Sequence, residues 1–67
     1  MTLQEVMDVT PEYQSFVITV EDEMTTGEIT KGTMEMGTFC KVHGTKQVRS
    51  LSITFTGKNL VSLSINI

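Results

Sequence analysis

The stretch that decides the fold is SLSITFTGKNLVSLSIN, residues 50–66 of this 67-residue chain. Apolar and polar side chains alternate on both sides of a loop at residues 56–60, the pattern of two half-buried strands. If Phe55 pairs with Val61, every other pair consists of two apolar or two polar side chains, with the apolar pairs on one face of the hairpin and the polar pairs on the other. The apolar pairs are Ile53–Leu63 and Leu51–Ile65, and the polar pairs are Thr54–Ser62, Ser52–Ser64 and Ser50–Asn66. A slip of one residue would set apolar against polar side chains, so the pattern predicts an antiparallel hairpin and its register, with Gly57-Lys58-Asn59 as the turn.

The second strand of this hairpin, Leu60–Ile67, carries no charged residue and no proline. Proteins use both to protect an exposed sheet edge. Two outcomes stay open: another strand of the chain covers this strand, or a second molecule does. A domain of this size buries only about 60% of the surface of its unfolded chain. A homodimer, formed by edge pairing or by burying Met and Phe side chains, is therefore one expectation.

Capping and alternation organise the first half of the chain. Thr2 and Glu5 form a capping box that predicts a helix from Leu3, which Pro11 ends. The alternating run Ser15–Val20 predicts a strand, and residues 21–24 predict a turn. A weaker return strand is expected over Thr25–Lys31.

Residues 33–44 fit two periods. Met36, Phe39, Cys40 and His43 have helical spacing, whereas an alternating pattern fits with one miss. Thr33 as a cap and Gly44 just past the end favour a short helix, although Gly37 weakens it by roughly 1 kcal/mol.

The fold class expected is a single α+β domain over residues 1–67. It has an N-terminal helix, two antiparallel β-hairpins that form one small sheet, and a short linking helix. The expected core consists of the inward positions of the strands: Phe16, Ile18, Val20, Leu51, Ile53, Phe55, Val61, Leu63 and Ile65.

The charges divide by sign along the chain. Residues 1–35 hold all eight acids against Lys31 alone, a net charge of −7, while residues 36–67 hold four cations and no acid, a net charge of +4. In one interpretation the halves pack together and their charges meet as weak surface pairs. In the other, carboxylates gather on one face and attract a basic protein surface. The partner-binding candidates are the acidic turn and two later acids: Glu21, Asp22, Glu23, Glu28 and Glu35.

The side chains that carry catalysis and metal binding are scarce. One cysteine and one histidine cannot supply the four ligands of a usual zinc site, so no metal and no cofactor are expected. Cys40 and His43 form a formal nucleophile and base pair, but a cysteine beside Phe39 fits a small buried hydrophobe better. The protein is therefore not expected to be an enzyme. No membrane span or signal peptide is recognisable, and a cytoplasmic location is expected.

Nucleic-acid binding is the alternative class. Lys41, Lys46, Arg49 and Lys58, with aromatic rings nearby, could contact phosphates and stack on bases. The acidic composition, with a pI near 4.8, opposes this class.

Two families share features with the chain. The chain resembles short accessory proteins of phages and mobile elements of Gram-positive bacteria. The resemblance lies in the opening MTLQEV, the acidic turn and the strand VRSLSI at residues 48–53. Some small acidic members of that group are anti-CRISPR proteins, so the resemblance implies an inhibitor that occupies the basic groove of a host nucleic-acid enzyme.

The chain is also similar to the tryptophan-activated RNA-binding attenuation protein, in FVI at residues 16–18, TKGT at residues 30–33 and the stretch from Ile53 to Val61. That likeness implies a homo-oligomeric regulator that binds RNA or a small ligand.

Overall fold

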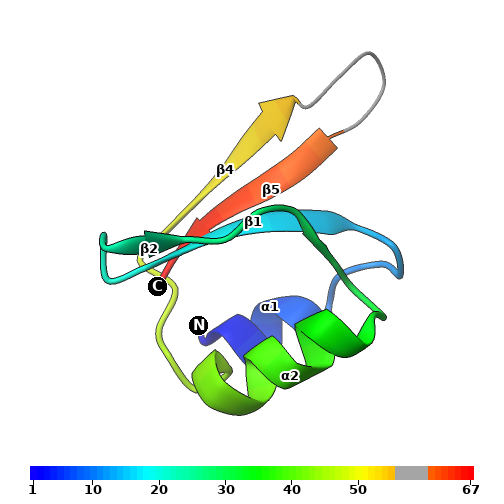
Figure 1. Ribbon diagram of the computed structural model, residues 1–67, viewed down its shortest axis with the longest axis horizontal. Coiled ribbons are helices and arrows are strands. Elements are labelled where there is room, and N and C mark those ends of the chain that lie inside the picture. The colour runs from blue at the N-terminus through cyan, green and yellow to red at the C-terminus, as the bar shows by residue number, and fades with distance from the viewer. Residues whose placement is uncertain (56–60) are drawn as a thin grey trace.

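The structure is a computed structural model that describes residues 1–55 and 61–67, with Phe55 described by its backbone alone. In chain order the elements are α1 (Leu3–Asp8), β1 (Ser15–Val20), β2 (Met24–Thr25), β3 (Ile29–Thr30), α2 (Met34–His43), β4 (Ser50–Phe55) and β5 (Val61–Asn66). Both helices lie on one side of a single sheet (Figure 1). The α+β class expected from the sequence is confirmed.

The sheet is mixed, which corrects the expectation of antiparallel hairpins alone. Its strand order is β2–β1–β5–β4. The strand β2 pairs with the C-terminal end of β1, and β3 pairs with the N-terminal end of β1, at Ser15 and Phe16. The two halves of the chain meet where β1 and β5 run parallel, with Phe16 opposite Leu63 and Ile18 opposite Ile65. Parallel neighbours need a long crossover connection, and here it contains α2 and β4. Both central strands direct isoleucines toward the helices, so their joining buries the most apolar parts of the chain.

The hairpin register predicted from alternation is confirmed at all six pairs, from Ser50–Asn66 to Phe55–Val61. The predicted turn at residues 57–59 lies outside the described residues. Two outcomes were left open for the last strand of the chain. In the structure β5 is covered by another strand of the same chain, since it lies between β1 and β4. The strand left at the edge of the sheet is β4.

The capping box predicted for α1 is confirmed. The Thr2 hydroxyl accepts a hydrogen bond from the backbone N–H of Glu5 at 3.2 Å, and the Glu5 carboxylate accepts one from the backbone N–H of Thr2 at 2.8 Å. Hydrogen bonding of the Glu5 carboxylate to Thr2, through its backbone first and its side chain second, holds the pKa of Glu5 below its ordinary value. Two of the unpaired N–H groups at the helix start are satisfied in this way.

Residues 34–43 form the helix α2, the favoured one of the two alternatives. Thr33 is its N-cap and accepts from the backbone N–H of Met36 at 3.2 Å. Gly44 ends it in a right-handed conformation, with φ at −60°. The glycine is needed there for space, because a Cβ would collide with the Cys40 carbonyl oxygen.

The return strand expected over Thr25–Lys31 is wrong as one element. It is two short pieces, β2 and β3, separated by Gly27 and Glu28. In the interruption the Thr26 hydroxyl accepts from the backbone N–H of Ile18 at 3.1 Å. A side chain thus takes the place of a ladder bond, so this edge of the sheet has no long run of free backbone groups.

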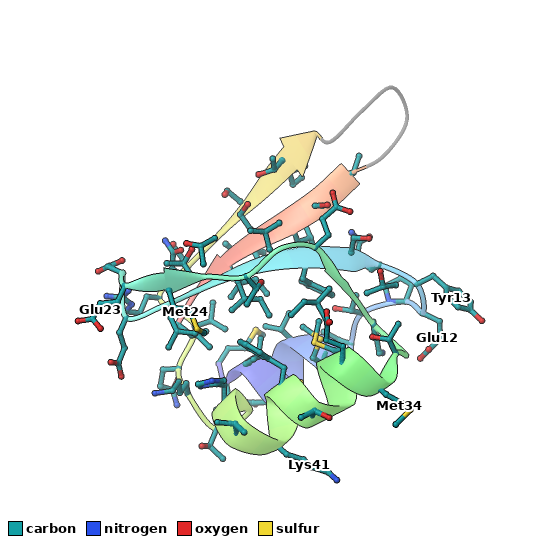
Figure 2. The ribbon with its side chains drawn as sticks, in the orientation of Figure 1. Glu12, Tyr13, Glu23, Met24, Met34 and Lys41 are labelled. Atoms are coloured by element: carbon teal, nitrogen blue, oxygen red, sulfur yellow. The ribbon has the colours of Figure 1, made fainter. Side chains whose placement is uncertain are left out.

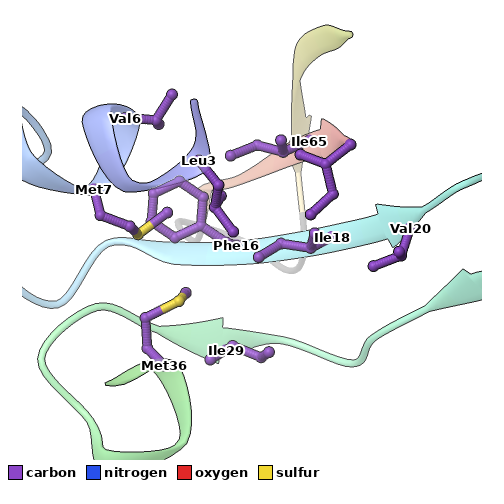
Figure 3. Close-up of a cluster of buried hydrophobic side chains, with 10 residues drawn as sticks. Leu3, Val6, Met7, Phe16, Ile18, Val20, Ile29, Met36 and Ile65 are labelled. Atoms are coloured by element: carbon purple, nitrogen blue, oxygen red, sulfur yellow. The ribbon is translucent and has the colours of Figure 1, made fainter. Parts of the chain in front are cut away.

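The core lies between the helices and β1, β3 and β5 (Figure 3). Its buried members are Leu3, Val6, Met7, Phe16, Ile18, Val20, Ile29, Met36, Ile65 and Ile67. Four predicted core residues are among them, and Leu63 packs against them partly buried. Leu51, Ile53 and Val61 were expected in the core and are exposed at 54%, 64% and 40%. Phe55 is a core prediction whose side chain lies outside the described part. The reason for the error is that α1 and α2 are too few to cover the whole apolar face, and β4 and the first residue of β5 are left beyond them.

Candidate functional site

The acidic segment at residues 21–23 is the tight turn between β1 and β2. Glu21 and Asp22 have positive φ angles of 52° and 58°, and the backbone N–H of Glu23 donates to the Val20 carbonyl at 3.0 Å. Two successive left-handed residues give the turn the twist that suits a hairpin. Each costs about 1 kcal/mol or more in a residue other than glycine. Glu23 lies at the tip of the hairpin (Figure 2).

Two of the three turn acids are matched by cations from the opposite half of the chain. Lys46 Nζ lies 3.2 Å from Glu21 Oε1, and Arg49 Nη2 lies 2.9 Å from Asp22 Oδ1. Both cations come from the segment between α2 and β4. All four side chains are substantially exposed, so each pair contributes about 0–1 kcal/mol. Glu21 and Asp22 therefore follow the first of the two charge interpretations, in which the acidic and basic halves of the chain meet through surface ion pairs.

Glu23, Glu28 and Glu35 are exposed and form no ion pair within residues 1–55 and 61–67. Glu28 lies between β2 and β3 on the sheet edge opposite β4. Glu35 is in the first turn of α2, which packs against β3. We call these three residues the acidic edge. Of the five predicted site residues, the structure therefore leaves three unmatched and pairs two.

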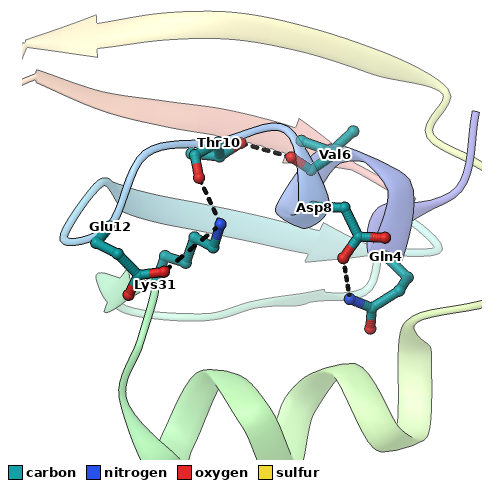
Figure 4. Close-up of polar contacts among 6 residues, drawn as sticks. All are labelled: Gln4, Val6, Asp8, Thr10, Glu12 and Lys31. Carbon is teal, nitrogen blue, oxygen red and sulfur yellow. Dashed lines mark hydrogen bonds and ion pairs between the residues drawn. The ribbon is translucent and has the colours of Figure 1, made fainter.

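A third carboxylate, that of Glu12, takes part in an ion pair that sequence reasoning missed. Lys31 Nζ lies 3.8 Å from Glu12 and donates to the Thr10 carbonyl oxygen, while the Thr10 hydroxyl donates to the Val6 carbonyl at 2.5 Å (Figure 4). This network fixes the chain between α1 and β1. Lys31 and Glu12 are far apart in sequence and have no shared periodicity, so no local pattern indicates the pair.

An open hollow of about 350 Å³ lies between the two helices, and the side chains of Lys31, Lys41 and Cys40 line it. Burial raises the pKa of the Cys40 thiol, and the nearby Asp8 carboxylate raises it further. A raised pKa keeps the sulfur protonated at neutral pH and lowers its reactivity, because the thiolate is the nucleophile. The geometry fits the interpretation of Cys40 as a small hydrophobe.

A second hollow, of about 400 Å³, lies on the other flank of α2 beside Glu35, Phe39, Val42 and His43. The His43 ring packs against Phe39 at a tilt of 41°, with ring centroids 4.6 Å apart. Its buried Nδ1 has no hydrogen-bond partner among the described residues. Both hollows are open to solvent.

Among the residues that the structure describes, no three His, Cys, Asp or Glu side chains are placed to hold a metal ion. Neither helix in residues 1–55 and 61–67 has the length and apolar character needed to cross a membrane. Comparisons with protein-family models, curated proteins and solved structures find no match. Functional inference therefore depends on the chain's own surfaces.

Proposed function

We propose that this protein is a non-enzymatic interaction protein whose acidic edge binds the basic groove of a larger nucleic-acid enzyme and excludes its substrate. The observation that carries the proposal is that Glu23, Glu28 and Glu35 are solvent-exposed and unmatched by cations of the described chain. A basic groove built for phosphates offers lysine and arginine side chains to such carboxylates. The resemblance to phage accessory proteins supports the same class of partner.

The ion pairs at the turn rank the acids by their expected contribution. Glu21 and Asp22 must give up Lys46 and Arg49 before they can contact another cation. Glu23 has no such pair to lose among the described residues and lies at the hairpin tip (Figure 2). Binding is therefore expected to depend more on the acidic edge than on Glu21 and Asp22.

The test is affinity capture from a bacterial lysate, followed by an activity assay of the captured enzyme. Wild-type protein is compared with the Glu23→Gln/Glu28→Gln variant and with Asp8→Asn/Glu12→Gln, which removes the same charge elsewhere. The proposal expects capture of a nucleic-acid enzyme, its inhibition, and loss of both in the first variant alone. Association should also slow as salt rises. Equal capture by both double variants, or capture without inhibition, would refute it.

A homo-oligomeric regulator that binds RNA or a small ligand is the second candidate. The hollow between α1 and α2 favours it, since Lys41 lines that hollow; Lys31 also lines it but is engaged with Glu12 and the Thr10 carbonyl oxygen. Two other cations expected to contact phosphate, Lys46 and Arg49, are already engaged with carboxylates. Filter binding at low salt tests this candidate, and RNA retention that is lost in Lys41→Gln would support it over the inhibitor.

A further inference from the structure

The β4 strand is an unprotected edge of the sheet. It is the last strand in the order β2–β1–β5–β4, so the backbone groups on its outer side have no strand partner in the described chain. Its sequence, SLSITF, contains no charge and no proline. The opposite edge differs: it is broken into two short strands with Glu28 in the interruption. Protection against edge pairing is thus present on one side of the sheet and missing on the other.

The apolar face of β4 is also uncovered. Leu51 is opposite Ile65 and Ile53 is opposite Leu63, so both belong to the face that the helices cover elsewhere. They are nevertheless 54% and 64% exposed. The β4–β5 hairpin extends beyond the two helices (Figure 1). Two aliphatic side chains and a free strand edge are therefore exposed side by side.

On the polar face of the same hairpin, side chains bond to one another within the chain. Thr54 and Ser64 share a hydrogen bond of 2.7 Å, and Asn66 donates to the Ser50 hydroxyl at 2.8 Å. The apolar side chains of Leu51 and Ile53 and the outer backbone edge of β4 are the parts of the hairpin that a partner would cover.

We propose that a second copy of this chain pairs its β4 antiparallel with this β4, about a two-fold axis, to form a homodimer with one continuous sheet. Residues directly opposite in an antiparallel pair share a face. Apolar side chains therefore lie opposite apolar ones only in registers in which odd-numbered residues of one β4 face odd-numbered residues of the other. Centring on Ser52 does so, since it places Leu51 opposite Ile53 of the partner subunit and Ser52 opposite Ser52 of the partner subunit.

Charge favours a second copy over a different partner. The surface to be covered is neutral, so it does not select a nucleic acid or a basic groove, and a second neutral β4 matches it. None of the three acidic-edge residues is on β4, and Glu28 lies at the opposite edge of the sheet, so the pairing does not place these carboxylates in the strand interface. Because each copy uses its one unprotected edge, the assembly closes at two chains.

This dimer does not depend on the proposed inhibitor function, because the pairing uses β4 and none of the three acidic-edge residues is on β4. If both hold, each dimer presents two acidic edges and can engage two sites. Loss of dimerisation would leave the binding of the acidic edge to be judged on its own. The Glu23→Gln/Glu28→Gln variant is likewise expected to dimerise like the wild type.

Sedimentation equilibrium from low to high micromolar concentration tests the pairing. The wild type is expected to shift from monomer to dimer, and Ile53→Lys to stay monomeric because it places a charge in the interface. The control is Val42→Lys, a change of a 68% exposed residue on α2, which should dimerise like the wild type. A wild type that is monomeric throughout, an Ile53→Lys dimer of unchanged affinity, or open-ended assembly would overturn the proposal.

Disulfide trapping checks the register without relying on the fold of Ile53→Lys. In a Cys40→Ser background, Ser52→Cys should form an intermolecular disulfide under mild oxidation, because opposed strand residues lie about 4.5–5.5 Å apart. Ser64→Cys in the same background should not, since β5 is one strand further in. Equal trapping at both positions, or none at Ser52→Cys, would overturn the register.

Discussion

Two isoleucines on the same face of one hairpin allow a matched test of the fold. Ile65 is fully buried, whereas Ile53 is 64% exposed, although alternation alone predicts the same environment for both. We compare Ile65→Val with Ile53→Val. Each change removes one methylene, and both residues are β-branched, so the strand preference is nearly unchanged.

The structure sets the expected size of each effect. Ile65→Val in a close-packed core should lower the free energy of unfolding by about 0.5–1.5 kcal/mol. At Ile53 only about a third of the side chain is shielded, and a fully buried methylene is worth about 0.8 kcal/mol, so the loss should be about 0.3 kcal/mol. A chain of this length is expected to have a total stability of roughly 3–10 kcal/mol, so both variants remain folded.

Urea unfolding followed by far-ultraviolet circular dichroism measures the difference. With a slope of about 1 kcal/mol per molar urea, the midpoint should fall by about 0.5–1.5 M for Ile65→Val and by about 0.3 M for Ile53→Val. Low micromolar protein keeps pairing through β4 from contributing. Ile18→Val is a control that should behave like Ile65→Val, because Ile18 is also fully buried. Equal midpoints for the Ile65 and Ile53 variants would show that the helices cover β4 after all, and the reasoning would fail.

Four further predictions concern the α1 cap, pH and two glycines. Thr2→Ala should lower the free energy of unfolding by about 1 kcal/mol, because it removes the α1 cap, while Thr2→Ser should restore most of it in the same urea assay. The pKa of Glu5 is lowered in the folded state, so the contribution of its carboxylate to stability is present above the unfolded pKa and is lost as pH falls through the folded pKa. Glu5→Gln should therefore flatten the acid limb of a curve of stability against pH. An unchanged acid limb would contradict this. Gly32→Ala should destabilise by about 1–2 kcal/mol, since Gly32 has a φ of 92° and a Cβ would lie 2.5 Å from the Glu12 carboxylate. Gly37→Ala, inside α2 with open space around it, should instead raise the thermal midpoint by gaining about 0.5–1 kcal/mol, and a lower midpoint would be evidence against the helix.

The local elements were predictable because short-range chemistry determines them. The capping box at Thr2, the cap at Thr33 and the register of the β4–β5 hairpin each depend on side chains a few residues apart or on strict alternation. Gly27 and Glu28 explain the one local failure, since they interrupt the return strand and the Thr26 hydroxyl replaces a backbone bond.

The arrangement of these elements could not be predicted in the same way. Alternation shows that Ile53 and Ile65 share a face, but which part of the face is covered depends on where α1 and α2 pack. The pairing of Glu21 with Lys46 spans 25 residues and that of Asp22 with Arg49 spans 27. Its only trace in the sequence is the opposite sign of the two halves, which is equally compatible with an unmatched acidic surface.

The central place of β5 has a consequence for how the chain folds. In the described part of the sheet, β5 alone joins β1 to β4, so residues 1–55 contain two groups of strands with no ladder between them. The first group must wait for the strand whose residues pair with β1 at a separation of 47 residues before its apolar face is closed, and such distant pairing slows folding. A nascent chain would therefore expose Phe16 and Ile18 until β5 has emerged, and chaperone binding during synthesis is expected to end at that point.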